Sequence, residues 1–322
     1  MSGNCDQCVV FGPVPSRRLG RSLGVNNIPP KHCSYSCIYC QLGSGRVVES
    51  ARRRFYEPSE IYEAAEKKLA EASLKNEAVD YLSFVPDGEP TLDVNLGECI
   101  NLLRRTGVKT AVITNASLLW KGDVRDDLMN ADWVSVKVDA VSAKVWRFIN
   151  RPYRGLDINR IHEGMLEFAG SYRGYLATET MLVTGVNDGA DEVSAVADLI
   201  GSLKPRKSYI SIPLRPPAEK RVSMPDESSV NMAWQIFTTR GLSTECLTGY
   251  EGNAFAQTGD IIDDILGITS VHPMREEALR CMLSEAGSDW VVVEELIRED
   301  KIFVTDYNGI NYYMKRFKTN GE

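Results

Sequence analysis

The stretch that decides this chain runs from Lys31 to Gly43 and reads KHCSYSCIYCQLG. It places Cys33, Cys37 and Cys40 at the spacing C-x3-C-x2-C. Cysteine thiolates are the ligands of iron–sulfur clusters, and a 4Fe-4S cluster takes one cysteine for each iron. Three cysteines leave one iron without a protein ligand, and an open metal position is one that binds a substrate or cofactor. The stretch therefore predicts a cluster with a vacant coordination site.

The three cysteines could instead be core residues or half of a structural zinc site. Cysteine is often buried in protein cores. A structural zinc site usually pairs two C-x2-C or C-x2-H knuckles at a distance, and this loop has no second half. His32 lies too close in sequence to Cys33 to be an obvious fourth ligand. The flanking residues and the motifs downstream favour the cluster.

Length and composition are those of an ordinary globular chain. The 322 residues can hold one large and one small domain, and charged residues make up 25%. No apolar run approaches the length of a membrane span, and the start MSGNCDQC is not a signal peptide. Eight cysteines in such a chain point to metal or redox chemistry rather than to disulfides. We expect a cytoplasmic protein with no membrane contact.

Charge is distributed unevenly along the chain. The net charge of −7 gives the whole molecule no general attraction for nucleic acid. Around the cysteine loop, however, Glu49 is the single acid between Ser16 and Arg54, and the stretch holds eight bases: Arg17, Arg18, Arg21, Lys31, Arg46, Arg52, Arg53 and Arg54. Arginines there can hold an anionic substrate or cofactor near the cluster. A solvated basic face balanced by acids elsewhere is the alternative, and both stay open.

Extended and helical patterns alternate after the cysteine loop. Strands are expected near 23–28 and over 81–85, 110–113, 133–138, 176–183 and 209–214. Helical patterns separate them, beginning at Pro58. Six such units predict an α/β fold with a parallel sheet, fewer than the eight of a closed TIM barrel. Active groups are then expected at the carboxyl ends of the strands.

The carboxy-terminal segment has a different order of helical and extended patterns. Helical patterns over 274–286 and 288–300 precede extended runs over 302–306 and 310–317, joined at Asn308-Gly309, a hairpin signal. This order predicts a winged-helix-like α+β module over 270–322, beside a larger domain over 1–265. Ten acids against seven bases disfavour DNA binding by this module, because phosphate contacts dominate nucleic-acid affinity. A lid or a protein contact is the favoured role.

The cysteine spacing and the run Asp87-Gly88-Glu89-Pro90 after the second strand resemble the radical S-adenosylmethionine (SAM) superfamily. The resemblance implies a partial (β/α)6 barrel with the cluster on the loop after the first strand. It also implies two cofactors, the 4Fe-4S cluster and SAM, whose amino and carboxylate groups chelate the open iron. Reductive cleavage of SAM then gives a 5′-deoxyadenosyl radical that abstracts hydrogen from an unidentified, possibly anionic, substrate.

The resemblance also assigns residues to SAM. Gly88 and Glu89 match the motif that receives the SAM amino group, and Tyr39 stands where the family has an aromatic residue near adenine. Polar residues at the strand ends are expected to contact the ribose and carboxylate: Asn115, Lys137, Asp139 and, as a further candidate, Arg215. No catalytic acid, base or radical-carrying residue is identifiable.

The run FGPVPSRRLGRSLGVN, with GEPTL and RPPAE, resembles one subgroup, the iron–sulfur oxidoreductases related to archaeal tRNA wyosine synthase. Wyosine synthase carries a second cluster on additional cysteines, whereas here only Cys5 and Cys8 lie upstream, and whether they bind metal stays open. A tRNA-modifying enzyme and a non-catalytic iron–sulfur protein of electron transfer or regulation are the alternatives. Expected partners are a reductant protein such as ferredoxin or flavodoxin, and a small-molecule, protein or tRNA substrate.

Overall fold

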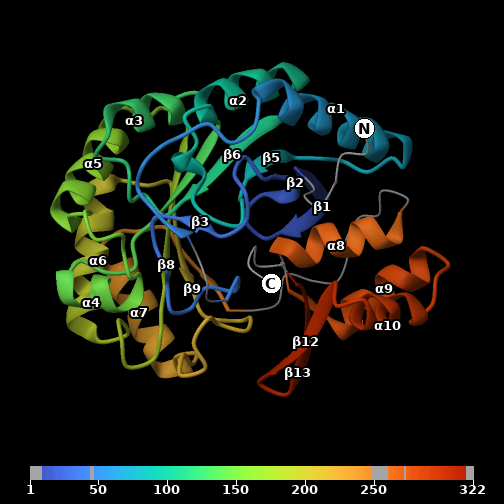
Figure 1. Cartoon of the computed structure of the whole chain (residues 1–322). Helices are drawn as coiled ribbons and strands as arrows, with labels where there is room; N and C mark the ends of the chain where they lie inside the picture. The colour runs from blue at the N-terminus through green and yellow to red at the C-terminus, as the bar shows by residue number, and fades with distance from the viewer. Residues whose placement is uncertain (1–8, 44–46, 249–259, 272, 317–322) are drawn as a thin grey trace.

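The curved sheet of the larger part of the chain carries the fold (Figure 1). The computed structural model describes residues 9–43, 47–248, 260–271 and 273–316. Within them, eight strands pair in the order β1-β2-β5-β6-β7-β8-β9-β10. Their bounds are Val10–Ser16, Gly20–Val25, Tyr81–Phe84, Lys109–Thr114, Trp133–Lys137, Tyr175–Met181, Lys207–Ser211 and Thr244–Leu247. The expected six-stranded parallel sheet is confirmed as β2 and β5 to β9.

Two edge strands extend that sheet beyond the sequence prediction. Strand β1 pairs antiparallel to β2, and β10 pairs parallel to β9. Strand β1 escaped prediction because its sequence, VFGPVPS, contains two prolines, which remove ladder donors and suit only an edge strand. Strand β10 is only four residues long and has no clear alternation.

Helices cover the outer face of the sheet, and all of them except α4 follow one another around it in chain order (Figure 1). They are α1 Pro58–Leu74, α2 Leu96–Leu103, α3 Gly122–Leu128, α4 Ala143–Ile149, α5 Ile158–Ser171, α6 Ala190–Leu203 and α7 Glu227–Thr239, with short 3₁₀ turns η1 Pro90–Leu92 and η2 Arg104–Thr106. The expected start at Pro58 is confirmed, and a capping box of Glu57 and Glu60 satisfies that helix end. Helix α4 was not expected, because seven residues are too few to show a helical period.

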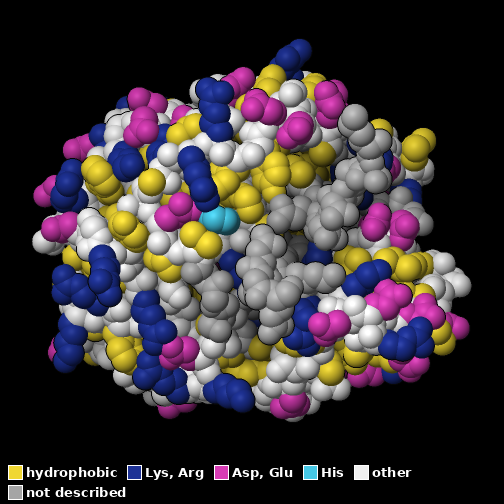
Figure 2. Space-filling view, viewed as in Figure 1, with side chains coloured by type: hydrophobic (Ala, Val, Ile, Leu, Met, Phe, Trp, Pro, Cys, Tyr) yellow, Lys and Arg dark blue, Asp and Glu magenta, His cyan; other side chains and the backbone are white. Residues whose placement is uncertain are grey.

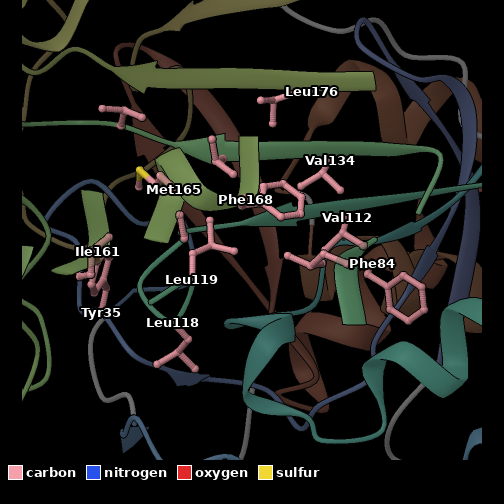
Figure 3. Close-up of a cluster of buried hydrophobic side chains, with 14 of the residues drawn as sticks. Tyr35, Phe84, Val112, Leu118, Leu119, Val134, Ile161, Met165, Phe168 and Leu176 are labelled. Carbon is pink, nitrogen blue, oxygen red and sulfur yellow. The ribbon is translucent and has the colours of Figure 1, made fainter. Parts of the chain in front are cut away.

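A row of apolar side chains across the strands forms the main core. The register aligns Val25, Phe84, Val112, Val134 and Leu176 on one face, and all five are buried. Because strand side chains alternate between faces, this row points toward the helices, leaving the neighbouring positions for the inner face. Figure 3 shows part of the row covered by the apolar side chains of α5. The core thereby fixes which residues of each strand face inward.

The carboxy-terminal module has an antiparallel sheet and a core of its own. Its elements are α8 Ile261–Val271, β11 Met274–Arg275, α9 Glu276–Glu285, α10 Val291–Arg298, β12 Ile302–Tyr307 and β13 Ile310–Lys315, with sheet order β11-β13-β12. Asn308 and Gly309 both have positive φ, 54° and 74°, so the predicted hairpin turn is confirmed. Helix α8 was not expected; it packs against β1, as seen at the right of Figure 1.

The surface carries both signs of charge. Figure 2 shows Asp and Glu side chains interspersed with Lys and Arg over the module that contains α9 and α10. Within the described part of the chain, no helix combines the length and apolar character needed to cross a membrane.

We predict that Phe84→Ala lowers the free energy of unfolding by about 3–5 kcal/mol, because Phe84 is fully buried in the central row. Leu74→Ala is the control: that side chain is 87% exposed, and we expect a change within about 0.5 kcal/mol. Urea unfolding of both variants measures the difference. Equal losses in the two variants would contradict the placement of the core.

Candidate functional site

A cavity of about 370 Å³ lies at the carboxyl ends of the parallel strands. This volume falls within the range of small-molecule and cofactor sites. Nine of the ten site residues expected from the sequence line it: Cys33, Cys37, Tyr39, Cys40, Gly88, Glu89, Asn115, Lys137 and Arg215. Side chains separated by up to 182 positions in the chain thus meet in one place.

The cysteine loop is held against the turn that follows β5. Lys31 N–H donates to the carbonyl of Asp87 at 2.6 Å, and Glu89 N–H donates to the carbonyl of His32 at 3.0 Å. A Cβ atom added at Gly88 would lie 1.8 Å from that His32 oxygen. Only glycine permits so close an approach of two backbones. Gly88 is therefore required for the placement of the cysteine loop.

Glu89 ties the same turn to the end of β6. Its buried carboxylate accepts hydrogen bonds from the Thr91 hydroxyl at 2.5 Å, the Thr114 hydroxyl at 2.6 Å and the Asn115 backbone N–H at 2.8 Å. Burial raises the pKa of Glu89, although these hydrogen bonds act in the opposite direction. Glu89 accordingly has a strong positioning role at the edge of the cavity.

Two asparagines direct N–H donors toward the cysteine sulfurs. Asn115 Nδ2 lies 3.6 Å from Cys33 Sγ, and Asn150 Nδ2 lies 3.4 Å from Cys37 Sγ. Donors of this kind stabilise thiolate charge and tune the potential of iron–sulfur clusters. Asn150 was missed by the sequence analysis, because it caps α4, a helix too short to be recognised.

The three cysteines of the loop are a donor set that suits an iron–sulfur cluster. No group of three His, Cys, Asp or Glu side chains that could hold one metal ion occurs among the described residues. In a 4Fe-4S cluster each thiolate binds a different iron, so the thiolates need only surround a common space. Cys33, Cys37 and Cys40 all line the same cavity. Their chemistry and shared location therefore suit a cluster.

The inner face of the sheet carries a buried charge cluster. Strand register places Lys137 opposite Glu179, with Lys137 Nζ 3.1 Å from Glu179 Oε1, and Arg18 forms a second ion pair with Glu179. Burial acts to raise the pKa of Glu179, but Arg18 and Lys137 outweigh it and lower the pKa from 4.5 to about 2. Within this group two cations face one anion, and two further acids, Asp87 and Glu89, line the same cavity.

Asp139 differs from the other nine expected site residues, because it does not line the main cavity. Its carboxylate accepts hydrogen bonds from the Tyr39 hydroxyl, from Asn150 Nδ2 at 2.7 Å and from the Met181 N–H at 2.9 Å. Asp139 is therefore held by the Tyr39 hydroxyl at the edge of the site, and its expected contact with SAM stays a prediction. Period-two alternation does not extend past the end of β7, so the sequence could not reveal this.

Part of the basic stretch is neutralised by neighbouring acids, through ion pairs of Arg18, Arg21, Arg52 and Arg53. Arg52, only 6% exposed, pairs with Asp123 and Asp127 and donates to the carbonyls of Thr91 and Asp93. Arg52 is a structural residue: acids balance its charge, as the alternative expected, but its side chain is buried rather than solvated. Of the eight bases, Arg17 and Arg18 line the main cavity. Arg46, Cys5 and Cys8 lie outside the described residues.

The chain is similar in sequence to proteins of a known superfamily. Residues 27–200 match the radical SAM superfamily. The chain belongs to this superfamily. A UPF0026 protein of Methanocaldococcus jannaschii is 42% identical over 313 residues, which cover 97% of each chain. The predicted superfamily is thus confirmed.

Two solved structures share the fold at low identity. A radical SAM methyltransferase from Sphaerobacter thermophilus is 16% identical, with a TM-score of 0.55, over 70% of this chain and 66% of the other. SuiB of Streptococcus suis bound to S-adenosylmethionine is 14% identical, with a TM-score of 0.51, over 71% and 52%. They support the partial barrel. As a radical SAM enzyme, the chain uses a 4Fe-4S cluster and SAM, so the non-catalytic alternative is set aside.

We predict that Gly88→Ala displaces the cysteine loop and lowers both stability and the iron retained per chain. The reason is the 1.8 Å separation that its Cβ would have from the His32 oxygen. Gly201→Ala is the control, since its Cβ meets nothing within 4 Å in α6, and we expect it to be neutral or stabilising by up to about 1 kcal/mol. Iron analysis and urea unfolding measure the two effects. Equal iron content and equal stability in the two variants would contradict this account.

We predict that Glu179→Gln destabilises the fold at pH 7 by on the order of 3 kcal/mol, because two partly buried cations lose their buried counter-charge. A lowered carboxyl pKa stabilises the fold above pH 4.5, and this contribution is lost as pH falls toward about 2. In urea unfolding, the difference in the free energy of unfolding between wild type and variant (the gap) should therefore narrow below pH 4.5. Exposed Glu163→Gln should show no gap at any pH; a gap for Glu179→Gln that is constant with pH would refute the ion-pair assignment.

Proposed function

We propose that this protein binds a 4Fe-4S cluster through Cys33, Cys37 and Cys40 and reductively cleaves SAM for hydrogen abstraction from a substrate. The observation that carries the proposal is the shared cavity, where the three thiols meet the residues expected to orient SAM. When bound, the cluster supplies one electron and SAM supplies the 5′-deoxyadenosyl radical. The protein contributes orientation, exclusion of water and charge.

The turn after β5 is proposed to bind the SAM amino group. An ammonium needs carbonyl and carboxylate acceptors, and Asp87, Gly88 and Glu89 present these at the cavity wall. The Glu89 carboxylate already accepts from neighbouring donors, and the Asp87 carbonyl accepts from Lys31, so the Gly88 carbonyl is the better candidate for direct contact. The Glu89 carboxylate keeps the turn and Asn115 in place.

The cations on the inner face are proposed to bind the carboxylate of SAM or an anionic group of the substrate. Lys137 Nζ lies 5.1 Å from the centre of the Tyr39 ring and is also held by Glu179. Arg215 donates to Gln41 of the cysteine loop at 2.9 Å, which fixes its guanidinium beside the cavity. A positioned guanidinium or ammonium binds a carboxylate with little loss of side-chain freedom.

Tyr39 and Asp139 are proposed to act together. The Tyr39 hydroxyl donates to Asp139, so the ring is locked beside Cys40, where it can pack near the adenine. Asp139 is a positioning residue in this account. The electron is proposed to come from an external reductant protein of the ferredoxin or flavodoxin type, as radical SAM enzymes in general need one.

We predict that anaerobically reconstituted protein, given dithionite and SAM, forms 5′-deoxyadenosine, and that Cys37→Ala abolishes this product and lowers the iron content. Loss of one of three thiolates removes a ligand that no neighbour can replace. Cys281→Ser is the matched control: Cys281 lies in α9 of the carboxy-terminal module, and its removal should leave iron and product unchanged. Absence of 5′-deoxyadenosine with intact wild type, or its persistence in Cys37→Ala, would refute the proposal.

A further inference from the structure

A second cavity, of about 250 Å³, lies between the cysteine loop and the carboxy-terminal module. One wall consists of Lys31, Gln41, Leu42 and Gly43, and the other of Thr269, Pro273, Phe303, Met314, Lys315 and Arg316. Gln41 and Leu42 also line the main cavity. The two cavities are therefore neighbours that share one piece of wall, just after Cys40.

The charge of the second cavity is positive on both walls. Lys31 comes from the cysteine loop, whereas Lys315 and Arg316 come from the end of β13, and no described lining residue is acidic. Arg316 pairs with Asp300 at 2.7 Å and its guanidinium lies 5.0 Å from the Phe303 ring centre. The module as a whole is acidic, so a basic face turned toward the cysteine loop is specific to this location.

The module is fixed to the wall of the main cavity by two tyrosines. Tyr307 Oη donates to the carbonyl of Pro213 at 2.9 Å, and Tyr312 Oη donates to the carbonyl of Leu214 at 2.8 Å. Pro213 and Leu214 line the main cavity. Val14 of β1 lines that cavity as well and packs against the core of the module. The second cavity is thus held in a fixed position relative to the first.

We infer that the second cavity binds the phosphate group of a small phosphorylated substrate whose reacting part occupies the main cavity. This inference rests on the proposed function and adds the substrate class. Lysine and arginine converging from two sides match a phosphate, which accepts several charge-assisted hydrogen bonds. Leu42, Phe303 and Met314 provide apolar surface for the part of the substrate next to the phosphate. The volume suits one or two phosphate groups and does not suit an RNA helix.

The test uses inorganic pyrophosphate as the probe and the full-length, anaerobically reconstituted protein. Calorimetric titration should show saturable binding to wild type, weakened at least about tenfold in Lys315→Ala/Arg316→Ala, because two charge-assisted contacts are lost. Lys315→Arg should retain binding, which separates loss of charge from loss of the hairpin. Arg298→Ala, which removes an exposed cation of α10 outside the cavity, is the matched control and should bind like wild type. Formation of 5′-deoxyadenosine is measured in parallel.

The outcomes separate this inference from the proposed function. No pyrophosphate binding by wild type, or equal binding by the double variant, overturns the inference while leaving SAM cleavage untouched. Absence of 5′-deoxyadenosine refutes the proposed function whatever the titration shows. A tRNA that binds and is lost in the double variant, with no binding of pyrophosphate, would overturn the inference in favour of an RNA substrate.

Discussion

The close contact of two backbones at Gly88 is the constraint on which the site depends. It allows the turn after β5 to form two hydrogen bonds with the chain just before the first cysteine. One is with the Lys31 N–H and the other is with the His32 carbonyl. Glu89 of the same turn holds Asn115, whose side chain points back at the sulfur of Cys33. A closed ring of contacts thus connects the cysteine loop to the ends of β5 and β6. This ring fixes the start of the cysteine loop, at Cys33, against the sheet.

Buried charge gives the cavity its chemical character. Glu179 lies between Lys137 and Arg18, and the excess of one cation remains after pairing. In a site with little water such charges act strongly on a bound anion. The second cavity extends the positive region past Gln41 toward the carboxy-terminal module. On the proposal made above, the two cavities together would hold an elongated anionic ligand.

Much of this site was predictable from local sequence, because each predicted residue stands beside a cysteine or at the end of a recognisable strand. Thr114-Asn115 and Lys137 follow apolar runs whose alternation is plain. Arg18 and Glu179 form a contact across 161 positions, which no local pattern reveals. The sequence left open whether Arg52 binds an anion or lies on a solvated face, and only the fold shows the two aspartates that pair with it. Strand β1 was missed because its two prolines interrupt the alternation of a strand. Helix α4 was missed because it is too short to show a helical repeat.

The central claim is that the cluster has an open iron which SAM occupies. Electron paramagnetic resonance of the reduced cluster, with SAM labelled by ¹⁵N at the amino group and ¹⁷O at the carboxylate, tests it most directly. The account predicts a shifted spectrum on adding SAM and hyperfine coupling to both labels. A cluster spectrum that does not change with SAM, or that shows a fourth protein ligand, would contradict it.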